Sequence, residues 1–118
     1  MQLKLTTRTV QDILVVSCDG RIVFGEESAE LRDTVKKLLA QKSQIVLNLG
    51  GVTYIDSGGL GTLVALYTTA HQAGGSVKLS NLTQRVGDLL QVTKLLTVFE
   101  VYETEEEAIE SFRKGAAA

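Results

Sequence analysis

One short stretch combines a hydroxyl that could accept a chemical group with neighbours that would expose it. Residues 56–61 read Asp56-Ser57-Gly58-Gly59-Leu60-Gly61. Three glycines within four positions make a poor helix start, since each costs up to about 1 kcal/mol relative to alanine. Another requirement must therefore favour them, and glycine lets a second protein approach a backbone closely because it has no Cβ. The pattern predicts an accessible hydroxyl at Ser57, at a helix start whose N–H groups and dipole favour an anion such as a phosphate.

The same residues also fit an ordinary structural interpretation. Asp and Ser are common N-caps of helices, and glycines are common in turns between a strand and a helix. On spacing alone, both interpretations stay open.

A catalytic role for Ser57 would need a base, and the chain has a single histidine, His71. The two residues are fourteen positions apart on one predicted helix, which is about 21 Å at 1.5 Å per residue. The hydrolase pattern Gly-x-Ser-x-Gly also fails, because Ile55 stands where its first glycine is required. With one cysteine, Cys18, the chain cannot build a cysteine metal cage. We expect no enzyme activity, no metal site and no cofactor.

The elements before Ser57 are predicted from hydrophobic periodicity. Leu3 to Thr7 alternates apolar and polar residues, a turn falls at Gln11-Asp12, and Ile13 to Ser17 is a short apolar run, which together predict a β-hairpin. We expect Ser28 to cap a helix that ends near Lys42. Ile45 to Leu49 is almost wholly apolar, as in a central strand that is covered on both faces.

From Ser57 onward, helices and strands are expected to alternate. The helix that begins at Asp56 or Ser57 should stop at Gly74-Gly75, where glycine suits the left-handed C-terminal position. A strand over 76–80, a helix from Thr83 to about Gln91 and a strand over 98–102 follow, and Thr104 with Glu107 forms a capping box for a last helix. The fold class is therefore α/β, a mixed sheet of about four or five strands with about four helices. We expect one domain over residues 1–114 and a short tail over residues 115–118.

Composition narrows the classes of partner. The chain has 118 residues, 44% hydrophobic and 22% charged, as in an ordinary globular domain. Its net charge is −2 and its 12 basic residues are scattered, so we expect no nucleic acid partner. No stretch is apolar for long enough to be a signal peptide or to span a bilayer, and a cytoplasmic location follows as an expectation. An acidic cluster over 103–110 fits either a solvated helix start or a surface for a basic partner.

The stretch from Ile45 to Gly61, VLNL followed by Asp-Ser-x-Gly-Leu-Gly, resembles the STAS domains and, within them, the stand-alone bacterial anti-anti-sigma factors. The expected order of helices and strands agrees over nearly the whole chain. The resemblance implies a mixed-sheet fold with no enzyme activity and a partner that is both anti-sigma factor and serine kinase. It also implies that Ser57 is the phosphorylated residue, that Asp56 is its acidic neighbour, and that Gly59, Leu60 and Gly61 match the conformational part of the signature.

Two positions depart from the family pattern. The family usually has Ser or Thr after the acceptor, where this chain has Gly58. It often has an acidic residue in the segment after the glycine that matches Gly20, on a surface that commonly faces the kinase. Here that segment contains Val23 and Phe24, which indicates either a different partner or two side chains that pack inward.

The resemblance implies a switch. Unmodified, the surface around Ser57, with Gly58 and the Val23-Phe24 segment, would bind the anti-sigma factor and release the sigma factor. Phosphorylation of Ser57 would cancel this binding. The alternative is a STAS module that is never phosphorylated and serves as a fixed scaffold in a transport or signalling complex.

Overall fold

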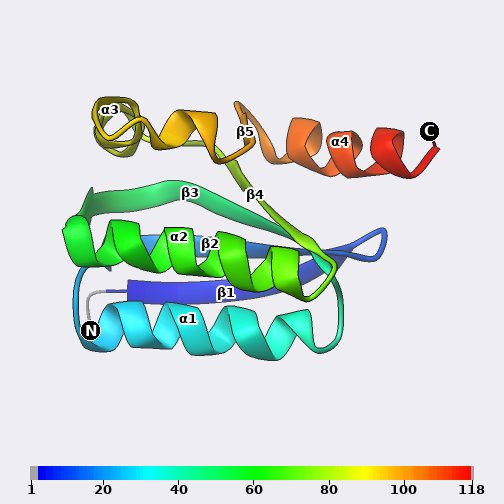
Figure 1. Cartoon of the computed structure of the whole chain (residues 1–118), viewed down its shortest axis with the longest axis horizontal. Coiled ribbons are helices and arrows are strands. Elements are labelled where there is room, and N and C mark those ends of the chain that lie inside the picture. Colours follow the sequence, from blue (N-terminus) through cyan, green and yellow to red (C-terminus); the bar gives the residue numbers. More distant parts are fainter. Residues whose placement is uncertain (1–2, 118) are drawn as a thin grey trace.

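The computed structural model describes residues 3–117 and consists of a five-stranded sheet with helices on both of its faces (Figure 1). The strands are β1 (Leu3–Val10), β2 (Ile13–Ile22), β3 (Gln44–Ile55), β4 (Ser76–Ser80) and β5 (Val101–Tyr102). The α-helices are α1 (Glu26–Leu39), α2 (Ser57–Gln72), α3 (Gln84–Val92) and α4 (Glu105–Ala117), and a short 3-10 helix, η1, covers Leu95–Thr97. The predicted class is confirmed. The division into a domain and a tail stays a prediction, and α4 continues through the first three tail positions.

The sheet has the strand order β1-β2-β3-β4-β5, in which β1 and β2 are antiparallel and every later pair is parallel. The predicted hairpin is confirmed, and its turn at Gln11 and Asp12 uses two positive φ values. The predicted coverage of β3 on both faces is confirmed too. Ile45 and Leu47 point into the larger core and Val46 points into the smaller one, because successive side chains of a strand alternate.

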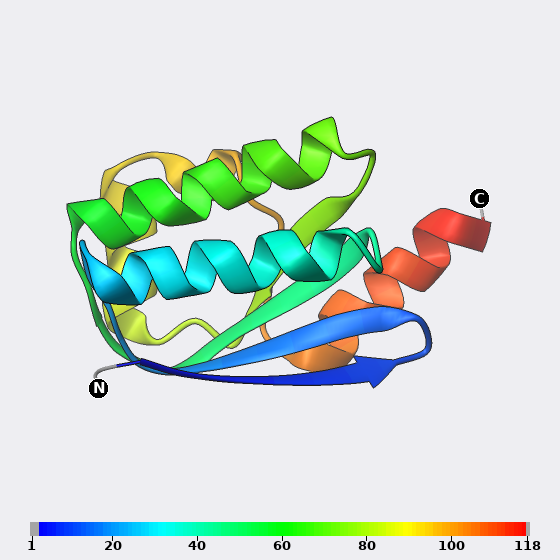
Figure 2. The ribbon, with the colours of Figure 1, turned by 90° about the horizontal axis from the view of Figure 1, so that it is seen from below.

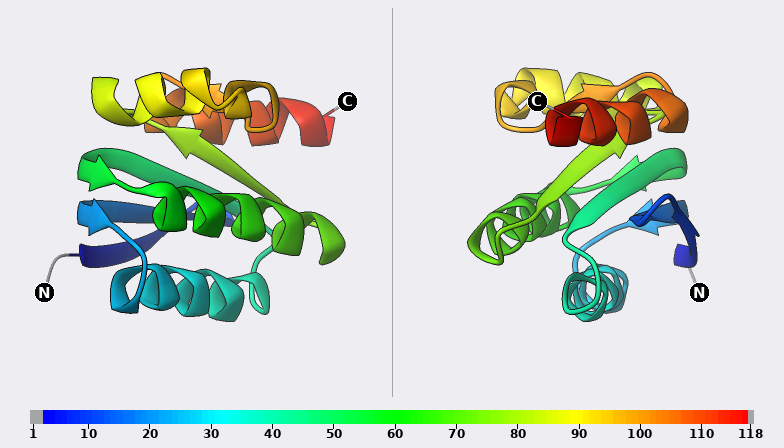
Figure 3. Two further views of the ribbon diagram at one scale, coloured as in Figure 1. Left: turned by 60° about the vertical axis from the view of Figure 1, so that its left-hand side comes forward. Right: turned by 90° about the vertical axis from the view of Figure 1, so that its right-hand side faces the viewer.

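The two cores hold the helices in place. In the larger core, α1 and α2 pack side by side on one face of the sheet (Figure 2), and α3 adds Val86 and Leu90. In the smaller core, α4 covers the other face with Ala108, Ile109 and Phe112. Figure 3 shows this arrangement with α1 and α2 seen nearly end-on in its right panel. In the described part of the chain, none of the helices is both long and apolar enough to cross a membrane.

The helix boundaries agree with several predicted caps. Thr83 caps α3 by accepting the N–H of Val86 at 3.3 Å. At the end of α2, Gly74 has a φ of +80°, and the N–H of Gly75 donates to the carbonyl of Ala70 at 2.8 Å, which closes the helix as glycine was expected to do.

The N-cap predicted at Ser28 is wrong. Helix α1 begins at Glu26 after Gly25, whose φ of +111° turns the chain into the helix. Ser28 is buried within the first turn, where its hydroxyl donates to the carbonyl of Val23 at 2.7 Å. The helix also ends at Leu39 rather than near Lys42.

Three strand boundaries differ from the prediction. Strand β2 runs on to Ile22, and β3 runs on to Ile55 through Gly50 and Gly51. A Cβ at Gly51 would lie 2.9 Å from the backbone carbonyl oxygen of Cys18, so glycine relieves crowding where the two strands approach each other. Strand β5 is shorter than predicted, because the N–H groups of Val98 and Phe99 donate to the carbonyl of Leu95 and continue the turn of η1 instead of pairing with β4.

Candidate functional site

The candidate site lies at one edge of the sheet, where three segments that are distant in sequence meet. Strands β2, β3 and β4 are parallel, so their carboxyl ends share this edge. The loop 23–25 follows β2, helix α2 follows β3, and α3 follows β4. Figure 1 shows the starts of α1 and α2 at the same end of the molecule as α3. Loops at the carboxyl ends of parallel strands are the usual place for binding sites in α/β proteins.

Asp56 ties two of these segments together. As the N-cap of α2, its carboxylate Oδ1 accepts the N–H of Gly59 at 2.8 Å. Both carboxylate oxygens also accept the N–H of Phe24, each at 3.1 Å. These backbone donors, Gly59 first and Phe24 second, lower the pKa of Asp56 because they favour the charged carboxylate. Asp56 therefore carries a negative charge at neutral pH and holds loop 23–25 against the start of α2.

Ser57 is the first residue of α2, and its side chain is exposed. The predicted role as an acceptor requires this position. Leu60, one turn further along the helix, is nearly buried at the floor of an adjoining groove. The groove is open and has a volume of about 670 Å³. Its other wall is α3, which contributes Arg85, Asp88, Leu89 and Val92.

The groove has an apolar wall and a polar rim. Val92 is 77% exposed, so one side of the groove presents an aliphatic surface to solvent. On the rim, the guanidinium of Arg85 lies 4.6 Å from the ring centre of Tyr54. The guanidinium of Arg21, outside the groove, lies 5.5 Å from the same ring. A groove of this kind, with Arg85 as well as Asp56 and Asp88 in its lining, suits a protein segment that carries both apolar and polar side chains.

The three signature glycines differ in what surrounds them. A Cβ at Gly59 would lie 2.0 Å from the carbonyl oxygen of Ile22, so α2 can approach β2 this closely only with glycine there. A Cβ at Gly58 would lie 2.6 Å from the Cβ of Phe24. At Gly61 no atom lies within 4 Å of the added carbon, and the residue is exposed. Gly59 therefore has a packing role, whereas Gly61 keeps one face of the helix bare.

The structure decides between the two interpretations of the Val23-Phe24 segment in favour of an exposed ring. Val23 is partly buried, but Phe24 is 82% exposed, the highest value among the exposed large hydrophobic residues in the described part of the chain. The phenylalanine thus lies beside Ser57 as an outward apolar group.

The α3 residues of the groove were missed by the sequence analysis, although the helix itself was predicted. Periodicity identified which face of α3 is buried, but it gave no relation between that helix and Ser57. The proximity of α3 to Ser57 could have been predicted from the parallel order of β3 and β4, because this order places the starts of α2 and α3 at the same edge of the sheet.

His71 lies on the same helix as Ser57, as expected, because α2 is continuous from Ser57 to Gln72. Its ring stacks on Tyr67, with 6.1 Å between the ring centres. At 1.5 Å per residue the two positions are about 21 Å apart along the axis. The histidine therefore cannot act as a base for this serine.

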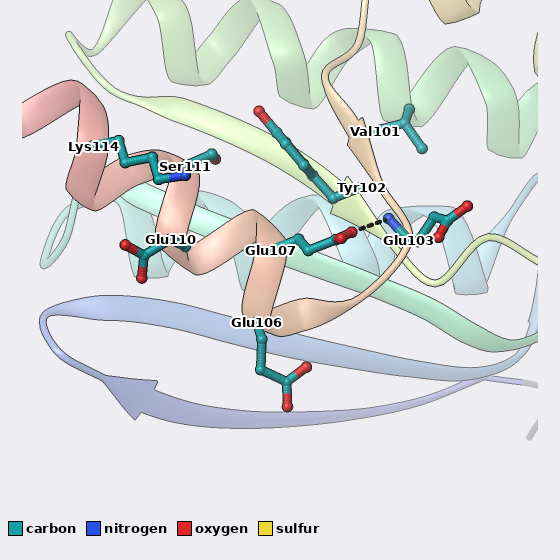
Figure 4. Close-up of a pocket in the computed structure, with 8 residues that line it drawn as sticks. All are labelled: Val101, Tyr102, Glu103, Glu106, Glu107, Glu110, Ser111 and Lys114. Carbon is teal, nitrogen blue, oxygen red and sulfur yellow. Dashed lines mark hydrogen bonds between the residues drawn. The ribbon is translucent and has the colours of Figure 1, made fainter.

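A second hollow, of about 740 Å³, lies between β5 and α4 (Figure 4). Glu103, Glu106, Glu107, Glu110 and Lys114 contribute most of its charged groups. Glu107 supports the start of α4, because its carboxylate accepts the N–H of Glu103 at 3.1 Å while its own N–H donates to the hydroxyl of Thr104 at 3.1 Å. The threonine half of the predicted capping box is confirmed, and the glutamate bonds one residue earlier than the box requires.

The chain therefore forms an α/β domain in which an exposed serine lies beside an open groove. The chain matches the model of the STAS domain over residues 4–108 and belongs to that family. This agrees with the resemblance seen at residues 45–61.

Among its relatives, the anti-sigma-B factor antagonist of Bacillus subtilis strain 168 is 34% identical over 71 residues, which is 60% of this chain and 65% of that protein. The matched part thus spans just under two thirds of that relative. The anti-sigma F factor antagonist of Paenibacillus polymyxa is 30% identical over 112 residues, covering 92% of this chain and 94% of the relative.

The solved structures of the anti-sigma factor antagonist SpoIIAA of Bacillus share the fold. The unphosphorylated form superposes with a TM-score of 0.77 at 21% identity, covering 94% of this chain and 97% of SpoIIAA. The phosphorylated form gives a TM-score of 0.70 at 20% identity, covering 93% and 98%. At these identities the likeness concerns the fold.

Proposed function

We propose that this chain is an anti-sigma-factor antagonist that binds an anti-sigma factor with serine kinase activity and is switched off when that kinase phosphorylates Ser57. The observation that supports this proposal most directly is the exposed serine at the start of α2, next to the groove between α2 and α3. Two relatives with related sequences are named anti-sigma factor antagonists, which supports the same role. A cytoplasmic location, where sigma factors act, belongs to the proposal.

The partner-binding surface in this proposal consists of two segments. One is the start of α2, with Asp56, Ser57, Gly58, Gly59, Leu60 and Gly61, and the other is the Val23-Phe24 segment. Gly59 and Asp56 support the surface from within through their contacts with Ile22 and Phe24. Ser57, Gly61 and Phe24 are exposed and would meet the partner directly.

Phosphorylation would act at the interface. A phosphate adds about −1.5 to −2 charges at neutral pH, and the start of a helix favours negative charge. The domain itself would therefore tolerate the modification. If a partner carboxylate lay about 6 Å away at an effective dielectric constant near 20, each added charge would cost on the order of 3 kcal/mol, about a hundredfold in affinity. The close approach permitted by the glycines adds a steric penalty for the phosphate.

In this proposal the chain contributes no catalysis of its own, because the kinase supplies nucleotide and magnesium. Ser57 is the substrate of the reaction. The known phosphorylated form of SpoIIAA supports a modification of this kind within the same fold.

The test compares Ser57→Ala with Ser57→Asp in binding to purified anti-sigma factors of the source organism, measured by calorimetry. We expect Ser57→Ala to bind as tightly as the wild type and Ser57→Asp to bind at least tenfold more weakly. Thr68→Asp is the matched control, because Thr68 is also exposed on α2 but lies three turns beyond Ser57. It should bind like the wild type.

A second measurement separates the switch from a fixed scaffold. The chain is incubated with ATP and the anti-sigma factor that it binds, and the phosphate is located by mass spectrometry. Phosphate on Ser57 supports the switch. An unmodified Ser57 together with equal binding by both Ser57 variants would rule out the switch and favour a scaffold.

A further inference from the structure

The two positions that depart from the family pattern are in contact with each other. The resemblance to the family implies a Ser or Thr where this chain has Gly58, and an acidic residue in the segment where it has Phe24. A Cβ at Gly58 would lie 2.6 Å from the Cβ of Phe24, 3.0 Å from its Cα and 3.1 Å from its Cδ1. Any side chain at position 58 would therefore displace Phe24. The two departures are one structural feature, because the bare backbone at position 58 lets the Cα and Cβ of residue 24 lie against α2, and the ring of Phe24 extends outward from there.

Phe24 is held in place although its ring is exposed. Its N–H donates to both oxygens of the Asp56 carboxylate at 3.1 Å, and its Cα and Cβ lie over Gly58. Ser57 is the residue between these two anchors. A backbone fixed in this way loses little conformational entropy when a partner covers the ring. The ring is 82% exposed, so nearly all of its surface is free to contact a partner.

We propose that Phe24, seated on Gly58, determines which partner docks at Ser57 by inserting into an apolar pocket of the anti-sigma factor. This inference rests on the proposed function and concerns the same site. An aromatic ring fixed beside the acceptor offers 150–250 Å² of apolar surface, on the order of a typical interface anchor, and no charge for a basic side chain to pair with. The anti-sigma factor that fits this chain therefore has aliphatic or aromatic side chains where it faces Phe24.

Gly58 has a permissive role in this arrangement. It contributes no side chain to the partner, but its lack of a Cβ allows Phe24 to lie against the start of α2. A Ser or Thr at 58 would push loop 23–25 away from α2 and strain the two hydrogen bonds from Phe24 to Asp56. The two residues should therefore be coupled in binding experiments, whereas independent contacts would be additive.

The experiment measures the Kd of the full chain for the anti-sigma factor that the wild type binds, with Phe24→Ala, Phe24→Leu and Phe24→Glu. We expect Phe24→Ala to weaken binding about 10- to 100-fold, as for an anchor residue, and Phe24→Glu to weaken it further. Phe24→Leu should stay within about threefold, because an apolar pocket accepts another apolar side chain of similar size. The matched control is Val98→Ala, since Val98 is also an exposed apolar residue but lies near His71, at the far end of α2.

The coupling is tested with Gly58→Ala alone and together with Phe24→Ala. Gly58→Ala should weaken binding by about tenfold, whereas in the Phe24→Ala background it should add less than about threefold. Kinetics of Ser57 phosphorylation give a second readout. Phe24→Ala should raise KM and leave kcat within about twofold, because the ring contacts the partner and not the reacting atoms.

The outcomes separate this inference from the proposed function. If Ser57→Asp loses binding while Phe24→Ala binds within twofold of the wild type, Phe24 is no anchor and the inference fails, but the switch stands. If Phe24→Glu binds as tightly as Phe24→Leu, or if Val98→Ala loses as much as Phe24→Ala, the apolar pocket beside Ser57 is wrong. If the wild type binds none of the anti-sigma factors, both proposals fall.

Discussion

Gly59 and Gly61 offer a sharp test of the packing at the start of α2, because the same substitution should have opposite effects two residues apart. Both residues lie in the first turns of the helix, where alanine is favoured over glycine by up to about 1 kcal/mol. At Gly61 nothing lies within 4 Å of an added Cβ, so Gly61→Ala should gain most of this preference. At Gly59 the added carbon would lie 2.0 Å from the carbonyl oxygen of Ile22.

The cost at Gly59 follows from how far the backbones must separate. Non-bonded heavy atoms need roughly 3.5 Å, whereas the added carbon would lie 2.0 Å from the oxygen of Ile22, so α2 and the end of β2 would move apart by about 1.5 Å. Overpacking of this kind costs about 1–3 kcal/mol. The movement would also weaken the hydrogen bond from the N–H of Asp56 to the carbonyl of Ile22, now 3.3 Å, and the bonds between Asp56 and Phe24. At about 1 kcal/mol for each bond lost, these terms outweigh the helix preference. We expect Gly59→Ala to be destabilised by about 2–4 kcal/mol.

Urea unfolding followed by circular dichroism measures both variants. With a slope of about 1.5 kcal/mol per M, Gly59→Ala should unfold about 1–2 M below the wild type and Gly61→Ala about 0.5 M above it. Equal midpoints for the two variants, or a stabilised Gly59→Ala, would refute the close approach of α2 to Ile22 on which the geometry of the site depends.

The further predictions concern four residues, Asp56, Cys18, Leu90 and Ser57. Asp56→Ala should cost about 1–2 kcal/mol, as for a lost N-cap, and urea unfolding at neutral pH checks it. Because the pKa of Asp56 is lowered in the folded chain, its stabilising effect is present above the unfolded pKa of about 3.9 and is lost as the pH falls through the folded pKa. Asp56→Asn should therefore flatten this part of the acid dependence, seen in unfolding at pH values between about 2 and 6. Burial raises the pKa of Cys18 to about 12, so a thiol reagent at neutral pH should modify it only as fast as the chain unfolds, in stopped-flow labelling. Leu90→Ala should lower the free energy of unfolding by about 2–5 kcal/mol, because Leu90 is fully buried on the inner face of α3. Thermal unfolding should show this loss. Ser57→Asp should keep or slightly raise the melting temperature, since its side chain is exposed at a helix start; a marked fall would contradict the idea that the charge acts only on the partner.

The parts of the fold with regular periodicity were predictable from the sequence. The hairpin at Gln11-Asp12, the helix from Ser57 to the Gly74-Gly75 turn and the cap at Thr83 depend on local chemistry, which a single segment contains. The prediction failed where contacts between segments that are distant in sequence determine where an element ends. The strand was predicted over Ile45 to Leu49, but β3 continues through Gly50 and Gly51 because β2 pairs with it there, with Asp19 opposite Gly51.

The candidate site divides in the same way. The serine at a helix start and its acidic cap are local features, and the sequence predicted both. The exposure of Phe24 depends on Gly58 and Asp56, which are more than thirty residues away in the chain, so periodicity around Phe24 alone left its orientation open. The groove wall on α3 likewise depends on the order of parallel strands.

The residues around Ser57 explain why a charge could be added there without disturbing the fold. The carboxylate of Asp56 accepts N–H groups from two backbone segments, at Gly59 and at Phe24. Gly58 is covered by Phe24, and Gly59 lies against the end of β2. Each of these neighbours is constrained, whereas the serine side chain among them is exposed. A residue whose own side chain is free, on a backbone that is held on both sides, can change its charge while its position stays fixed. An added charge then changes the binding free energy of the protein that covers the site and leaves the stability of the domain unchanged. Because the position of the serine is fixed, the change is the same each time the partner docks.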